Sequence, residues 1–178
     1  IIEGSRRDCA KEMMVLAAAL TIQDPRERPA EVRGTADEMH ARFTDDKSDF
    51  SSFLLLWQYI NERQAELSSS QLRKMCHREF INFLRIREWQ DLFAQLREMG
   101  RTANIRVSNG RDIDASGREV EIHKSLLSGL LSHVGAKEER EKTYGKAPRG
   151  PREYLGARGT KFAIFPGSGL FKQNPDWV

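Results

Sequence analysis

The stretch FINFLRIREWQDLFAQL, residues 80–96, decides the fold class of this 178-residue chain. Its apolar side chains recur at the spacing of one face of an α-helix, and they are Ile86, Trp89, Leu92, Phe93 and Leu96. Gly100 follows as a candidate C-terminal glycine. The pattern therefore predicts an amphipathic helix that buries one face and ends near Gly100.

A second apolar stripe precedes this helix and begins after three serines, residues 68–70. Its members are Leu72, Met75, Cys76, Phe80 and Phe83. The two stripes do not share one helical phase. We therefore expect the helical path to kink or restart between Asn82 and Arg87.

Further towards the N-terminus, the sequence predicts three more helices. Residues 8–22 are rich in strong helix formers and predict a largely buried helix, which the prolines of a polar loop at residues 24–29 terminate. Residues 36–43 predict a short amphipathic helix. Ser48 or Asp49 can cap the third helix, whose wide apolar stripe is formed by Phe50, Phe53, Leu54, Trp57 and Ile60.

Towards the C-terminus, the pattern changes from helix to strand. Residues 101–118 predict a weakly structured connection, and residues 119–134 predict another helix. After a basic Pro/Gly-rich linker at residues 136–151, the period becomes two. Arg158-Gly159 can then join strands near residues 153–157 and 160–165 in a hairpin. The fold class is thus mainly α, with a helical bundle at residues 1–135 and a small β element at residues 152–178.

Composition and charge restrict the function. The chain is 39% hydrophobic and 31% charged, which suits a compact domain rather than a disordered one. Its net charge of +3 is too small to indicate nucleic-acid binding by itself. Residues 142–172, however, hold seven basic side chains against the single acidic Glu153, so the positive charge is concentrated near the C-terminus.

The sequence lacks the motifs typical of zinc sites, membrane spans and several classes of enzyme. The two cysteines, Cys9 and Cys76, form neither a CxxC motif nor a zinc-ligand spacing, which favours a reducing cytoplasm. The longest apolar run is far too short to span a bilayer, and no export signal precedes it. Phosphate-loop, HExxH and GxSxG motifs are absent, and the four histidines are scattered. We therefore expect no catalytic residue, no metal site and no membrane partner.

Asn82, Arg85 and Arg87 are candidate binding residues because they lie where the two stripes lose phase. A helical projection turns the guanidinium of Arg85 towards the apolar side, where such a charge needs a partner. Two interpretations stay open: an ion pair or a long side chain reaching water, and a groove through which phosphates or bases pass.

The C-terminal segment offers a second candidate. The glycines of PGSG, residues 166–169, let backbone N–H groups approach a ligand, although such a motif is more often only a turn. Basic and aromatic side chains surround it and favour contact with nucleic acid, namely Arg152, Tyr154, Arg158, Lys161, Phe162, Phe165 and Lys172.

Four stretches together resemble a known family. Residues 18–29 (AALTIQDPRERP), 80–96, 122–135 (IHKSLLSGLLSHVG) and 153–171 (EYLGARGTKFAIFPGSGLF), with PDWV at 175–178, are similar to the C-terminal helicase-associated region of bacterial DEAH-box ATP-dependent RNA helicases of the HrpA type. The resemblance covers nearly the whole chain. Residues 101–117 match nothing in that region.

The resemblance implies a specific architecture and role. Residues 1–30 would be the tail of a winged-helix region, the helices up to residue 135 a ratchet-like bundle over the RNA channel, and the β element the start of an OB-fold. Single-stranded RNA would be the partner, together with motor domains of the same polypeptide that use ATP and Mg²⁺. The implied RNA contacts are Asn82, Arg85 and Arg87 on the ratchet edge, and Arg158, Lys161 and Ser168 on the OB-fold.

Departures from the family pattern restrict this expectation. The family's phosphate loop, DEAH sequence and motif-six arginines are absent, so we expect no ATP hydrolysis and no bound cofactor in this chain. Only about two of the five strands of an OB-fold fit before Val178. We expect this truncated β element either to fold back on the bundle or to pair with a second chain in a dimer.

The predicted function is therefore that of an accessory fragment of an RNA helicase, because the chain begins at Ile1-Ile2 and lacks motor motifs. Two alternatives stay open. The chain could be a self-standing nucleic-acid-binding module, or it could be a helical adaptor for a protein partner. In the second alternative its basic residues would meet acidic protein surfaces.

Overall fold

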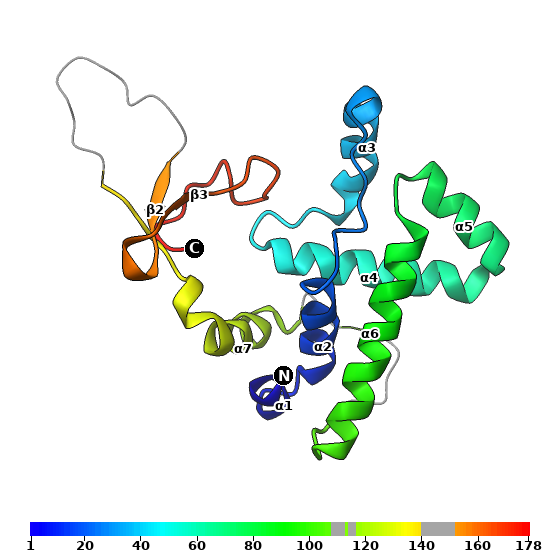
Figure 1. Ribbon diagram of the computed structural model, residues 1–178, viewed down its shortest axis with the longest axis horizontal. Coiled ribbons are helices and arrows are strands. Elements are labelled where there is room, and N and C mark those ends of the chain that lie inside the picture. The colour runs from blue at the N-terminus through cyan, green and yellow to red at the C-terminus, as the bar shows by residue number, and fades with distance from the viewer. Residues whose placement is uncertain (108–112, 114–116, 140–151) are drawn as a thin grey trace.

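The computed structural model describes residues 1–107, 113, 117–139 and 152–178. Within these residues seven α-helices precede three short strands, as Figure 1 shows. The α-helices are α1 (Ile2–Arg6), α2 (Ala10–Ala19), α3 (Arg33–His40), α4 (Asp49–Glu66), α5 (Ser69–Arg78), α6 (Phe83–Thr102) and α7 (Glu119–Leu130). Short 3-10 turns are η1 (Ala30–Val32), η2 (Ala41–Phe43), η3 (Leu131–His133) and η4 (Ala157–Gly159), and the strands are β1 (Ala136–Lys137), β2 (Glu153–Leu155) and β3 (Lys161–Ala163). The predicted fold class, mainly α with a small β element, is confirmed.

The core is built around α2, which packs against α4, α6 and α7. Every residue of α2 except Ala17 is buried. Trp89 of α6 is fully buried against it and donates a hydrogen bond from Nε1 to the carbonyl oxygen of Val15 at 2.9 Å. The rings of Phe53 and Trp57 on α4 meet the Trp89 ring edge-on. The helices α2, α4 and α6 therefore share one core.

The predicted restart between the two apolar stripes is confirmed. Helix α5 ends at Arg78, Phe80 adopts a left-handed backbone conformation with φ of 54°, and α6 begins at Phe83. The intervening backbone pairs with the proline-containing loop: the N–H of Glu27 donates to Phe80 O, and the N–H of Asn82 donates to Pro25 O, both at 2.8 Å. The break between the helices thus forms a short two-stranded contact with residues 25–27.

The predicted end of α6 at Gly100 is wrong. The helix continues through Gly100, which is buried, to Thr102. A Cβ at Gly100 would lie 2.6 Å from the Cε of Met14, so this glycine allows α6 to approach α2 closely and does not cap the helix. Much of the predicted connection at residues 101–118 lies outside the described residues.

The β element contains one strand more than the sequence predicted. The hairpin of β2 and β3 is confirmed, with Arg158 and Gly159 at positive φ in its turn. In addition, β1 pairs antiparallel with β2, which gives the order β1-β2-β3. The other edge of β1 meets the chain end, because Gly135 and Val178 exchange N–H···O bonds of 2.7 and 2.9 Å. The sequence pattern assigns the residues of β1 to the linker, because β1 has only two residues, which is too few to show an alternation of apolar and polar side chains.

Within the described ranges, none of the helices is both long and apolar enough to cross a bilayer.

Candidate nucleic-acid interface

Asn82 lies where the proline-containing loop meets the start of α6. Its Oδ1 accepts a hydrogen bond from the backbone N–H of Arg85 at 3.1 Å, which caps the helix. Its Nδ2 donates to the Oε1 of Glu27 at 2.7 Å. The side chain of Asn82 therefore fastens residues 24–29 to the first turn of α6 through both of its polar atoms.

Arg85 is half-buried in the first turn of α6 and has two polar partners. Its Nη1 is 2.7 Å from the Oε2 of Glu88, and its Nη2 donates to the Oε1 of Gln23 at 3.1 Å. The side chain is 38% exposed, so the ion pair is solvated and contributes less than about 1 kcal/mol to stability. This geometry matches the ion-pair alternative.

Arg87 differs from its two neighbours. It is exposed, and its guanidinium has no hydrogen bond or ion pair with any other residue in the described ranges. Its donors are thus open to an external acceptor. Arg87 can therefore bind a phosphate without breaking an internal contact, whereas Asn82 and Arg85 would first have to release their partners.

The second predicted group lies in the β element. Arg158 is exposed in the turn between β2 and β3 and has φ of 59°. The Nζ of Lys161 is 2.6 Å from the Oε1 of Glu138, and this carboxylate raises the pKa of the ammonium group. The Oγ of Ser168 accepts from the N–H of Leu170 at 3.1 Å. Lys161 and Ser168 therefore have local partners, whereas Arg158 is paired with no described residue.

The two groups lie far apart. Figure 1 shows the β element at one end of the long axis of the molecule and the junction of α5 and α6 towards the other, with α7 and α4 between them. The structure therefore brings Asn82, Arg85 and Arg87 together, and it places Arg158, Lys161 and Ser168 on one small element. It does not join the groups in a single pocket.

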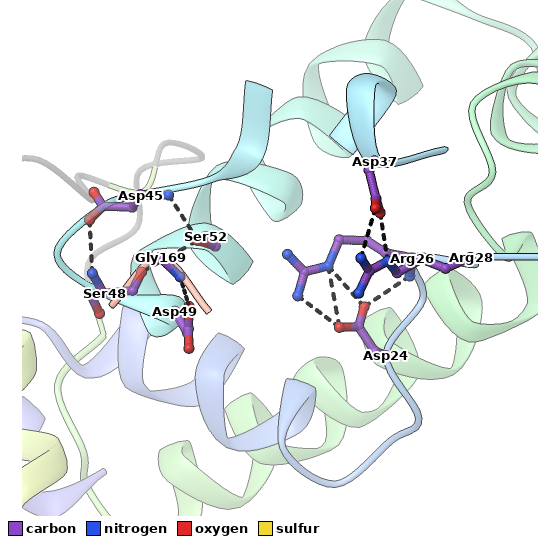
Figure 2. A network of polar contacts seen from close by, with 9 residues as sticks. All are labelled: Asp24, Arg26, Arg28, Asp37, Asp45, Ser48, Asp49, Ser52 and Gly169. Carbon is purple, nitrogen blue, oxygen red and sulfur yellow. Dashed lines mark hydrogen bonds and ion pairs between the residues drawn. The ribbon is translucent and has the colours of Figure 1, made fainter. Parts of the chain in front are cut away.

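The PGSG motif contacts the helical bundle. The N–H of Gly169 donates to the Oδ1 of Asp49 at 3.1 Å, as Figure 2 shows, and Gln173 Nε2 donates to the carbonyl oxygen of Asp46. A Cβ at Gly169 would lie 2.3 Å from the carbonyl oxygen of Asp45, so the approach requires glycine. We name this contact between residues 169–173 and 45–49 the latch. It is the fold-back contact predicted for the β element, and pairing with a second chain stays a prediction.

Further hydrogen bonds fix the loop before α4, to which residues 169–173 bind. The Oδ1 of Asp45 accepts from the N–H of Ser48 at 2.9 Å, and the N–H of Asp45 donates to the Oγ of Ser52 at 3.0 Å (Figure 2). The Oγ of Ser48 in turn lies 2.7 Å from the Nε2 of His123 on α7. Residues 169–173 therefore dock on a loop that hydrogen bonds to α4 and α7 already hold in place.

Two arginines of the proline-containing loop are paired. Arg26 binds Asp24 through Nη2 at 2.7 Å, and Arg28 binds Asp37 of α3 through Nε at 2.6 Å and Nη2 at 2.8 Å, as seen in Figure 2. The hydrogen bonds from Arg28 lower the pKa of Asp37. A bidentate pair of this kind is the stronger form of ion pair. These arginines thus position the loop.

Sequence reasoning did not identify the carboxylate of Glu79. It is buried between α5 and α6 and accepts a hydrogen bond from the hydroxyl of Tyr59 at 2.8 Å and pairs with Arg42 and Arg78. Burial, followed by the bond to this carboxylate, raises the pKa of Tyr59. No periodic signal marks Glu79, since it lies just after the last residue of α5.

The described residues contain no group of three or more His, Cys, Asp and Glu side chains able to hold a metal ion. Both thiols are free and buried. Burial raises the pKa of Cys76 to about 11, so this thiol is protonated at neutral pH. A thiolate nucleophile is therefore not available at Cys76.

Comparisons with known proteins bear on these surfaces. No family model matches the chain. Over its whole length it is 44% identical to the ATP-dependent RNA helicase HrpA of Escherichia coli strain K12 and 47% identical to the HrpA homolog of Haemophilus influenzae, and it spans 12% of each. It is 27% identical to the pre-mRNA-splicing factor ATP-dependent RNA helicase prp22 of Schizosaccharomyces pombe, of which it spans 14%.

Both comparisons cover all 178 residues of this chain. The chain spans about an eighth of the length of these bacterial relatives. This chain is thus similar, along its entire length, to one segment of the bacterial DEAH-box RNA helicases of the HrpA type, as its motifs predicted.

Proposed function

We propose that this chain is a non-catalytic part of a DEAH-box ATP-dependent RNA helicase and that it grips single-stranded RNA while motor domains of the same polypeptide move the strand. One observation carries the proposal: full-length identity of 44% and 47% to two HrpA-type helicases. Identity at this level across the whole chain supports a shared role for the segment.

The proposed RNA contacts lie on two surfaces, one at the start of α6 and one on the β element. At the start of α6, Arg87 offers unpaired donors to a phosphate, while Asn82 and Arg85 hold the edge of the helix in position. On the β element, Arg158, Lys161 and Ser168 supply polar contacts. Side chains of Phe165 and Trp177 are 64% and 70% exposed on the same element. Exposed rings beside cations suit stacking of unpaired bases, which favours nucleic acid over an acidic protein partner.

ATP chemistry belongs to other domains in this proposal. The sequence lacks a phosphate loop and a DEAH motif, so ATP and Mg²⁺ would bind in the motor domains. We place the protein in the cytoplasm, because the two thiols, Cys9 and Cys76, are unpaired.

RNA binding and ATP hydrolysis by the 178-residue chain test the proposal together. We expect a fluorescent single-stranded RNA of about 12 nucleotides to bind and ATP turnover to be absent with or without RNA. Arg87→Gln should weaken binding, whereas Lys124→Gln on α7 should not, although both substitutions remove one exposed cation. Undetectable RNA binding at low salt, or RNA-stimulated turnover by this chain, would overturn the proposal.

A further inference from the structure

A cavity outside both candidate surfaces lies between α4 and α5. It has a volume of about 420 Å³, within the usual size range for a site that holds a small organic group. Its lining comprises Tyr59, Arg63, Leu67, Gln71, Lys74, Met75, Arg78 and Glu79. We call it the α4–α5 pocket.

Three basic side chains line the α4–α5 pocket, and their charge is incompletely neutralised. Lys74 has no ion pair with any residue of the described ranges. The Nε of Arg63 is buried without a hydrogen-bond partner, although its Nη1 is 2.8 Å from the Oε2 of Glu66. A buried guanidinium N–H without an acceptor is costly.

The one acidic side chain of the pocket is already engaged. The carboxylate of Glu79, whose side chain is 7% exposed, accepts from Tyr59 and pairs with Arg42 and Arg78. Arg42 lies outside the pocket lining and supplies a full positive charge to it. Two arginines thus share Glu79, and Glu66 pairs with Arg63, so Lys74 keeps no counter-charge among the described residues. The three cations of the lining outnumber its one carboxylate, and the pocket therefore favours an anion.

The lining also has an apolar part. Met75 is buried and Leu67 is half-buried, and both line the cavity beside the basic side chains. A ligand that satisfies both parts carries a negative group and a flat apolar body. A nucleotide unit, with a phosphate and a base, has this chemistry.

We propose that the α4–α5 pocket binds one nucleotide unit of a single RNA strand, with the phosphate held by Arg63, Lys74 and Arg78 and the base against Leu67 and Met75. This inference rests on the proposed function and adds a third contact point to it. A nucleotide unit is favoured over a bare acidic side chain of a protein partner because it satisfies the apolar as well as the basic part of the lining.

The test compares two double variants of the full chain. Lys74→Gln with Arg78→Gln removes two cations of the pocket, and Lys124→Gln with Arg97→Gln removes two exposed cations elsewhere. Circular dichroism melting first verifies that each variant is folded. Arg78→Gln leaves Glu79 its bonds from Arg42 and Tyr59, so the fold should tolerate it.

The measurement is the affinity for a fluorescent single-stranded RNA of about 12 nucleotides at several salt concentrations. We expect the pocket variant to bind about tenfold more weakly and to lose about 0.7 from the salt slope for each phosphate contact removed. The control variant should change neither quantity by as much. Equal effects of the two variants, or no effect of either, would overturn the inference while RNA binding by the parent chain still supported the proposed function.

Two competitors identify the source of the nucleotide chemistry. Uridine monophosphate should displace the RNA only weakly, because a strand contributes further contacts. Displacement by the free nucleotide as efficient as by unlabelled RNA would contradict a strand-binding pocket. Displacement by a polyglutamate peptide that depends on Lys74 and Arg78 would assign the pocket to acidic protein partners instead. If the parent chain does not bind RNA at all, the proposed function itself fails.

Discussion

Trp89 joins the central helix to its largest neighbour. It is fully buried, its Nε1 donates to Val15 O, and its ring meets Phe53 and Trp57 edge-on. Trp89→Phe should lower the free energy of unfolding by about 2 kcal/mol, because a hydrogen bond is lost and a cavity remains. Urea unfolding followed by circular dichroism measures this. Trp177→Phe, at a site 70% exposed, should change it by less than about 0.5 kcal/mol.

His40 makes stability depend on pH. Its Nε2 lies 3.0 Å from the carbonyl oxygen of Glu79, and burial lowers the pKa of its imidazole. The unfolded chain therefore binds a proton more readily, and the free energy of unfolding should decrease as pH falls below about 6.5. His40→Gln should flatten this dependence in unfolding titrations between pH 5 and 7. The same slope in His40→Gln as in the exposed-site control His77→Gln would contradict the assignment.

The polar residues at the centre of the candidate surfaces could be found in the sequence only in part. The loss of phase between two stripes correctly marked Asn82 as a junction residue, since it caps α6. The contact of Arg85 with Gln23 and the burial of Glu79 could not be derived, because Gln23 and Arg42 come from distant parts of the chain. Such contacts depend on tertiary packing rather than on local pattern.

At the scale of elements, helix capping contributes measurably to α5. Ser68 and Gln71 form a reciprocal capping box at its start. Ser68→Ala should therefore lower the free energy of unfolding by about 1 kcal/mol, as measured by urea unfolding. Ser70→Ala, inside the same first turn and exposed, should have no such cost. Equal losses in the two variants would show that the box does not stabilise α5.

The latch depends on the absence of a side chain at Gly169. Gly169→Ala places a methyl group against Asp45 O and should release residues 169–173 from α4, so their backbone amides should exchange with solvent faster. Hydrogen exchange with mass spectrometry measures this. Gly129→Ala in α7 meets nothing within 4 Å and should instead raise the free energy of unfolding by up to about 1 kcal/mol. Unchanged exchange in Gly169→Ala would refute the latch.

Elements with a long periodic pattern were predictable, and short paired ones were not. The stripe from Ile86 to Leu96 and the hairpin turn at Arg158-Gly159 contain their own structural signals. The strand β1 contains only two residues, and its partners are β2 and the chain end near Val178. Likewise, Gly100 looks like a helix end in sequence, but close packing against Met14 explains it.

At the scale of the whole molecule, RNA would contact separate places. The arginine edge of α6, the α4–α5 pocket and the β element lie on different elements, and a strand that touches more than one of them would be held at several points along its length. Linked contacts of this kind raise the total affinity well above that of any single contact. A short RNA should accordingly bind much more weakly than one long enough to span two sites.

The salt dependence of RNA affinity tests the central claim most directly. For the 178-residue chain and a single-stranded RNA, the logarithm of the association constant should fall linearly with the logarithm of salt concentration, by about 0.7 for every phosphate neutralised. A slope corresponding to at least two phosphates is the predicted result. Undetectable binding at about 50 mM salt, or an affinity that does not change with salt, would contradict the account that this chain grips RNA through its basic side chains.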